Sequence, residues 1–135
     1  METPTFDIKC IIPPPDTAGA MPPFKQVTQP GEGPPPHVHR DQLEIFHVIE
    51  GDFEFTLNGN TVKRSTGGSI VIPIGAAHTF KNVGTSSGVV HFELLPANNI
   101  EEFFRRVDED FANIEDMPAF FDQYGMDLLE PRPHN

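Results

Sequence analysis

Between residues 43 and 95 the chain is a succession of short apolar or alternating segments, each closed by residues that favour turns. Residues 53–57 alternate apolar and polar side chains, and Asn58-Gly59 follows them. Asn-Gly is the preferred two-residue turn of a tight hairpin, because both positions must tolerate a positive φ. Further strands are expected at 43–49, 61–64, 69–72, 78–82 and 89–95. Short strands separated by turn residues predict an all-β antiparallel sandwich or barrel.

The rest of the chain suits one small domain. The 15 prolines and 11 glycines in 135 residues fit a chain that turns often. We expect a single domain with a proline-rich arm at 1–35, a barrel core at 36–97, and a helical segment with a tail at 98–135. Short strands are expected within the arm at 5–12 and 24–28. The single cysteine, Cys10, excludes a disulfide within the chain and a cysteine-based zinc site.

The pattern changes after Pro96, where apolar residues recur at helical spacing. The apolar residues of this spacing, which is that of a helix, are Ile100, Phe103, Phe104, Val107, Phe111 and Ile114. Such a phenylalanine stripe is expected to pack against the rest of the protein. A second short helix is expected at 118–124, beginning on a proline.

The net charge of −11 limits the choice of partners. The sequence has 20 acidic and 9 basic residues, so its surface repels phosphate backbones and anionic lipid. We therefore expect neither nucleic acid nor a membrane as a partner. No stretch approaches 18 apolar residues, and the N-terminus lacks a basic region followed by a long apolar run. A cytoplasmic protein is the resulting expectation.

Three histidines and one glutamate form a candidate metal-ligand set. His37 and His39 are two residues apart, so both side chains point to the same side of a strand. Glu44 lies five residues further, and strict alternation would turn it away. The set therefore requires a turn or bulge at 40–42. His78 would approach from another strand, directed by the turn at 73–75.

This ligand set indicates a transition metal. Imidazole with one carboxylate suits Fe, Mn, Ni, Co, Cu or Zn and does not suit Ca²⁺. Four protein ligands on an ion that accepts six leave two positions for water, O2 or substrate. The alternative is that these are scattered polar residues, since a His-x-His pair alone is a weak signal.

The same residues carry a family resemblance. Two spaced motifs resemble the two signature motifs of the cupin superfamily, with every fixed position present and 15 residues between them: Gly31-x5-His37-x-His39-x4-Glu44-x6-Gly51 and Gly67-x5-Pro73-x-Gly75-x2-His78-x3-Asn82. Residues 31–51 and 124–131 are also similar to small cupins grouped with quercetin 2,3-dioxygenase-like proteins. One motif pair makes the chain similar to a monocupin.

The resemblance implies a jelly-roll barrel of antiparallel strands, with a short C-terminal helical appendage and a metal inside the barrel. It also implies a small-molecule substrate and, in many members, a homodimer. By similarity to the quercetinase-like group, substrate would bind through a deprotonated oxygen, with Glu44 as the general base. The resemblance does not fix the reaction, because cupins range from dioxygenases to isomerases, cyclases and binding proteins.

Alternation along the strands predicts the substrate pocket. Phe46 and Val48 share a strand face with Glu44, and Phe80 shares one with His78. Phe55 and Phe92 are expected to add to the lining. The other two histidines among the strands, His47 and His91, have the opposite alternation and are expected outside the pocket.

Apolar walls around one polar spot favour a small molecule with an oxygen that can bind a metal. The leading hypothesis is a metal-dependent dioxygenase acting on a small phenolic or enol-like molecule. Two alternatives stay open: an isomerase or cyclase that uses a metal but no O2, and a non-catalytic protein that binds a small molecule.

Overall fold

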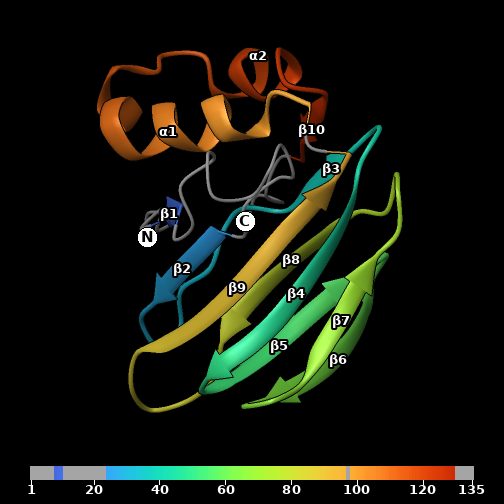
Figure 1. The fold of residues 1–135 in the computed structure, drawn as a ribbon, viewed down its shortest axis with the longest axis vertical. Helices are drawn as coiled ribbons and strands as arrows, with labels where there is room; N and C mark the ends of the chain where they lie inside the picture. Colours follow the sequence, from blue (N-terminus) through green and yellow to red (C-terminus); the bar gives the residue numbers. More distant parts are fainter. Residues whose placement is uncertain (1–7, 11–23, 97, 130–135) are drawn as a thin grey trace, which may run out of the picture.

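The computed structural model describes residues 8–10, 24–96 and 98–129. Two five-stranded antiparallel sheets face each other (Figure 1). The first sheet has the order β1-β2-β9-β4-β7, with these bounds: β1 Ile8–Cys10, β2 Phe24–Thr28, β9 Gly88–Leu95, β4 Leu43–Glu50 and β7 Ser69–Ile72. The second has the order β10-β3-β8-β5-β6, with these bounds: β10 Met126–Leu128, β3 His37–His39, β8 His78–Asn82, β5 Asp52–Leu57 and β6 Asn60–Ser65.

These sheets confirm the predicted all-β antiparallel jelly roll, with one difference. Backbone pairing divides the described strands into two separate sheets, so the fold is a sandwich and not a closed barrel. The predicted hairpin at Asn58-Gly59 joins β5 to β6, and both turn residues have positive φ, 48° and 84°. The sheets extend beyond the predicted core at 36–97, because β2 from the proline-rich arm and β10 from the C-terminal segment both join them.

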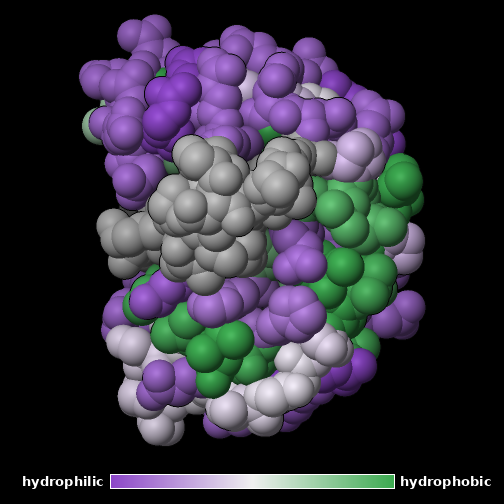
Figure 2. Space-filling model, viewed as in Figure 1, coloured by the Kyte–Doolittle hydropathy of each residue, from purple (hydrophilic) through white to green (hydrophobic). Residues whose placement is uncertain are grey.

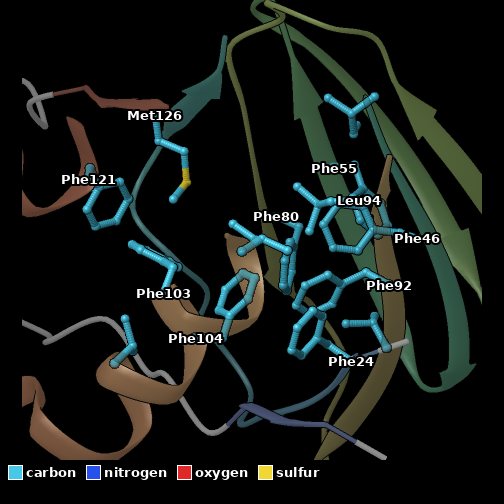
Figure 3. Packing of buried hydrophobic residues seen from close by; sticks show 14 of the residues in the cluster. Phe24, Phe46, Phe55, Phe80, Phe92, Leu94, Phe103, Phe104, Phe121 and Met126 are labelled. Atoms are coloured by element: carbon cyan, nitrogen blue, oxygen red, sulfur yellow. The ribbon is translucent and has the colours of Figure 1, made fainter. Parts of the chain in front are cut away.

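Phenylalanine fills the space between the sheets (Figure 3). The inward positions of β4, β5 and β8 bring three rings together: the centroids of Phe46 and Phe80 lie 5.2 Å apart, and that of Phe55 lies 5.3 Å from Phe46. Each of the three is at most 3% exposed. Burial of each such ring contributes roughly 1.5–3 kcal/mol. The core therefore stabilises the face-to-face arrangement of the two sheets.

Two helices cover one end of the sandwich (Figure 1). Helix α1 (Ile100–Asp110) buries Ile100, Phe103, Phe104 and Val107. Phe111 and Ile114, which the same spacing included in the helix, lie beyond its end and are partly buried. A 3₁₀ turn, η2 (Phe111–Asn113), and helix α2 (Met117–Asp122) follow. The Asp116 side chain caps α2 by accepting a hydrogen bond from the Ala119 N–H at 3.0 Å. Within the described residues, neither helix has the length and apolar character needed to cross a membrane.

Asn82, the last fixed position of the second motif, ties three parts of the fold together. Its side chain is 1% exposed and donates to the carbonyls of Thr28 at 2.8 Å and Ser86 at 2.9 Å. Its side-chain oxygen accepts from the Gly84 N–H at 2.7 Å. These bonds join β8 to β2 and to the loop before β9.

We predict that Asn82→Ala lowers the free energy of unfolding by at least about 2 kcal/mol, because it leaves buried backbone groups without a partner. Urea unfolding followed by circular dichroism measures this. The control is Lys81→Ala, at the neighbouring exposed position of the same strand, which should change stability by less than about 0.5 kcal/mol. Equal losses in the two variants would contradict this role for Asn82.

Candidate metal centre

The four predicted ligands meet between the two sheets. His37 and His39 lie on β3 and His78 lies on β8, all in the second sheet, where His37 pairs directly with His78. Glu44 comes from β4 in the first sheet. The chain bends at Arg40 and Asp41 to pass from one sheet to the other. The five-residue interval from His39 to Glu44 is therefore a change of sheet, which is why alternation along one strand fails there.

The C-terminal segment holds this bend in place. The Arg40 N–H donates to the carbonyl of Gly125 at 2.8 Å. The Arg40 guanidinium forms ion pairs with Asp127 and, at 3.0 Å, with Asp122. The position of Glu44 relative to the histidines thus depends on residues more than eighty positions away in the sequence.

The ligand atoms are close enough to bind one ion. One nitrogen or oxygen atom of each residue lies within 4.8 Å of the others. Glu44 Oε1 is 3.0 Å from His78 Nε2 and 3.3 Å from His39 Nε2. His39, Glu44 and His78 are each at most 3% exposed, and His37 is partly buried.

Backbone carbonyls orient two of the imidazoles. His37 Nδ1 is 2.8 Å from the oxygen of Pro35, and His78 Nδ1 is 3.0 Å from the oxygen of Ala76. A carbonyl only accepts, so each Nδ1 carries the proton and donates it. The lone pair of each Nε2 is then directed towards the centre. This is the usual arrangement of a metal-binding histidine held by a second hydrogen bond.

His39 supplies the test of whether a metal fits. Both of its ring nitrogens are buried, and neither makes a hydrogen bond. A buried polar group without a hydrogen bond is costly. A cation among the four groups would satisfy the His39 nitrogen and balance the Glu44 carboxylate. The residues present therefore fit a divalent transition metal, with imidazole nitrogen and carboxylate oxygen as its donors.

The electrostatics of the centre give two of the four candidate ligands the protonation state that binds metal. Burial, with His78 and His39 nearby, lowers the pKa of His37 to about 3. Burial alone would raise the pKa of Glu44, but His39 and His78 outweigh it and hold that pKa well below its usual range. Burial lowers the pKa of His78, but the hydrogen bond and charge of Glu44 raise it overall. Glu44 is therefore ionised and His37 is neutral, as metal binding requires.

The turn between β7 and β8 explains one further motif position. Gly75 has a φ of +82°, which a residue with a Cβ rarely adopts. Its N–H donates to the carbonyl of His39 at 2.9 Å. The glycine thus fastens the turn before His78 onto the strand that carries the other two imidazoles.

A small cavity of about 30 Å³ adjoins the centre. His37 and Glu44 line it, so the candidate metal centre opens into it. The full lining is Gln26, Pro34, Pro35, His37, Glu44, Phe46, Phe80, Phe92, Phe103, Phe104, Phe121 and Met126. Figure 3 shows the phenylalanines of the sheets facing those of the helical segment.

The structure places three of the five expected pocket residues at this cavity. Phe46, Phe80 and Phe92 line the cavity, but Val48 and Phe55 do not. Both are at most 2% exposed and belong to the core. Phe55 packs against Phe53 and Phe80 between the sheets, away from the end that the helices cover. Alternation correctly predicts that the side chains of Val48 and Phe55 point inward. It does not predict how far along the sandwich a cavity extends.

Sequence reasoning missed seven lining residues, and two of them, Pro34 and Pro35, come just before the strand that carries His37. Phe103, Phe104, Phe121 and Met126 come from the C-terminal segment. The helical spacing of Phe103 and Phe104 showed that they pack, but not that they pack beside the metal ligands. The Phe121 ring lies 6.0 Å from that of His37. Gln26, a buried amide on β2, could have been found as a polar residue at an inward position between Phe24 and Thr28.

The remaining two histidines of the sheets lie outside the site. His47 and His91 face each other across β4 and β9 on the outer side of the first sheet. His47 Nε2 is 3.8 Å from Glu93 Oε1. The alternation argument for these two residues agrees with the structure.

Comparison with known proteins decides the family. The family profile of the cupin domain matches residues 24–93, just over half of the chain. The chain belongs to the cupin family. All four candidate metal ligands of this cupin lie within the matched residues.

The curated relatives are longer proteins, and this cupin matches only part of each. It is 33% identical over 92 residues to the polyketide synthase CurC of Streptomyces cyaneus, covering 67% of this chain and 59% of CurC. It is 28% identical over 104 residues to the oxidoreductase macE of Penicillium terrestre, covering 76% of this chain and 38% of macE. The match therefore spans less than two thirds of either relative.

Solved structures support the fold. A predicted oxalate decarboxylase from Thermotoga maritima has a TM-score of 0.58 at 19% identity, covering 64% of this cupin and 76% of that chain. The cupin domain of Schizosaccharomyces pombe Cnp3 has a TM-score of 0.53 at 23% identity, covering 68% and 66%. At such identities the likeness is one of fold alone.

We predict that His37→Ala/His78→Ala lowers the bound transition metal of the purified protein at least about tenfold, because two of four ligands are lost. Elemental analysis by mass spectrometry measures metal per chain. The matched control is His47→Ala, which removes an imidazole from the outer face and should retain wild-type metal. Circular dichroism checks that each variant is folded. Equal metal content in the double variant and the control would disprove the site.

Proposed function

We propose that this cupin is a metal-dependent oxidoreductase of the dioxygenase type that acts on a small phenolic or enol-like molecule. One observation carries the proposal: His37 and Glu44 belong both to the candidate metal centre and to the wall of an otherwise largely apolar cavity. A substrate in that cavity would place its apolar skeleton among phenylalanine rings and its oxygen at the ligands.

The residues of the chain have distinct parts in such a reaction. Phe46, Phe80 and Phe92 would hold a flat substrate and keep water away from its reacting end. Glu44 would accept the proton of the substrate hydroxyl at its carboxylate. A low pKa makes Glu44 a weak base by itself. A bound divalent ion would lower the pKa of that hydroxyl and, if redox-active, support chemistry with O2.

The names of two relatives support an oxidation reaction, and the name of a third favours a second candidate function. Two relatives are named as oxidoreductases: macE, and the probable oxidoreductase yanE of Aspergillus niger, which is 30% identical over 90 residues. The relative CurC is named a polyketide synthase. Polyketide chains enolise readily, so an O2-independent cyclase or isomerase acting on an enol is the second candidate. A protein that only binds such a molecule is the third.

An oxygen electrode with a panel of phenols and β-diketones separates these functions. We predict that the metal-loaded protein consumes O2 as substrate disappears, and that Glu44→Gln lowers the rate by about 10²–10⁴, because the amide neither accepts the proton nor binds the ion as a carboxylate does. His47→Ala should keep the wild-type rate. Turnover that proceeds at the same rate without O2 would favour the cyclase or isomerase. Tight binding without any product would leave only the binding function.

The helical segment should set the size of the substrate. Phe104 is 8% exposed, lines the cavity and packs on Phe24 and Phe92, with ring centroids 4.8 and 5.3 Å away. A cavity of about 30 Å³ has room for little more than a water molecule unless side chains move. Phe103, Phe104 and Phe121 of the two helices line this cavity.

We predict that Phe104→Leu raises kcat/KM for two-ring phenols relative to one-ring phenols by about tenfold, because it removes part of the wall. Steady-state kinetics with matched substrates measures the ratio. Phe55→Leu is the control, since it shortens a buried phenylalanine that does not line the cavity. A ratio that changes equally in both variants would show a general loss of packing and not a specificity role for Phe104.

A further inference from the structure

One polar side chain in the cavity wall is not a member of the candidate metal centre. Gln26 lies on β2 at an inward position between Phe24 and Thr28, and it is 2% exposed. Glutamine is rarely buried so completely, because burial removes its amide from water. Apart from His37 and Glu44, the other described side chains of the wall are apolar. Gln26 is therefore a separate polar position in an otherwise apolar cavity.

Strand pairing gives the position of Gln26 relative to the metal ligands. Gln26 pairs with Val90 on β9, and Val90 pairs with Val48 on β4, four residues after Glu44. At a rise of about 3.3 Å per residue, Gln26 and Glu44 lie roughly 13 Å apart along the strand direction. Strand β9 also lies between the two strands that carry them. The two polar positions are thus at separate places along the cavity.

Phenylalanine rings occupy the interval between these two polar positions. On the first sheet, Phe24, Phe92 and Phe46 lie opposite one another on β2, β9 and β4. The ring centroids of Phe24 and Phe92 are 5.4 Å apart, and those of Phe46 and Phe92 are 5.5 Å apart. The first sheet is therefore polar at Glu44, aromatic in the middle and polar again at Gln26.

The helical segment presents its apolar side to the cavity and its polar side to the outside. Phe103 and Phe104 of α1 and Phe121 of α2 are buried and line the cavity. The surface over the two helices is mostly hydrophilic (Figure 2). A ligand with an apolar middle is therefore complementary to the inside of the cavity and not to this surface of the helices.

We propose that Gln26 determines specificity by binding a second oxygen, at the end of the substrate far from the metal centre. This inference rests on the proposed function, which places a phenol or enol oxygen at the near end. A side-chain amide has two N–H donors and an oxygen that accepts two bonds, so Gln26 can bind a substrate hydroxyl or carbonyl and still keep a hydrogen bond within the protein. The substrate class is then an elongated phenol or enol with an oxygen at each end and an apolar middle.

A buried amide discriminates against a substrate that lacks the second oxygen. With such a substrate bound, the amide faces apolar atoms and loses a hydrogen bond that water or the correct substrate would make. Sites that hydrogen-bond a substrate group reject the analogue without that group more strongly than apolar pockets reject a change of size. Two ligands of equal size that differ only at the far end therefore measure the role of Gln26.

Titration calorimetry with the full-length, Zn²⁺-loaded protein tests this role without any turnover. The matched ligands are 4-(2-hydroxyethyl)phenol and 4-propylphenol, which carry a hydroxyl and a methyl group at the far end. The measured quantity is the Kd of 4-propylphenol divided by that of 4-(2-hydroxyethyl)phenol. Gln26→Met fills the same space without the amide, and it should lower this ratio at least about tenfold. Gln26→Asn withdraws the amide by one carbon and should lower the ratio too.

Thr28→Val is the matched control. Thr28 is the next inward residue of β2, it is fully buried, and it does not line the cavity. Among the described residues its hydroxyl has no hydrogen-bond partner, so valine replaces it at little cost. This variant should keep the wild-type ratio. Both ligands are measured on one preparation, so a partly unfolded variant changes neither Kd.

The inference is wrong if Gln26→Met and Gln26→Asn keep the wild-type ratio, if Thr28→Val lowers it equally, or if the wild type binds neither ligand. These outcomes are separate from those of the oxygen electrode. The expected ratios in a protein that consumes no O2 would refute the dioxygenase and support the role of Gln26. Consumption of O2 with an unchanged ratio in Gln26→Met would do the reverse.

Discussion

The buried contact between Glu44 and His78 joins the two sheets at the candidate metal centre. A carboxylate that is 3% exposed requires positive charge or several hydrogen bonds close to it. His78 Nε2, 3.0 Å from the carboxylate, supplies part of this requirement only while it is protonated. A divalent ion would supply the rest. The bend at Arg40, the Gly75 turn and the carbonyls of Pro35 and Ala76 all serve to hold these groups in position.

The sequence predicts this centre well because its signals are local. Two histidines on one strand share a face by alternation, and Asn58-Gly59 fixes a hairpin through the φ values of its own residues. The position of Glu44 was informative because it broke the alternation. That conflict required a turn at 40–42, and the structure has bends at Arg40 and Asp41 where the chain changes sheet.

Other features depend on contacts that the sequence pattern does not contain. The spacing of Phe103 and Phe104 predicts a helix with one buried face, but not the surface that this face covers. Val48 and Phe55 show the same limit on the strands, since alternation gives the side of the sheet and not the depth along it. The division into two sheets depends on which distant strands pair, and the spacing of strands and turns is compatible with either a sandwich or a barrel.

The candidate metal ligands and part of the cavity wall lie on different parts of this chain. All four candidate ligands fall within residues 24–93, the part that matches the cupin profile. The cavity wall also takes Phe103, Phe104, Phe121 and Met126 from beyond that part. Similarity over the matched region therefore says more about the metal centre than about the identity of the substrate. Because the same C-terminal segment anchors Arg40 through Gly125 and Asp127, it couples the shape of the cavity to the bend that positions Glu44.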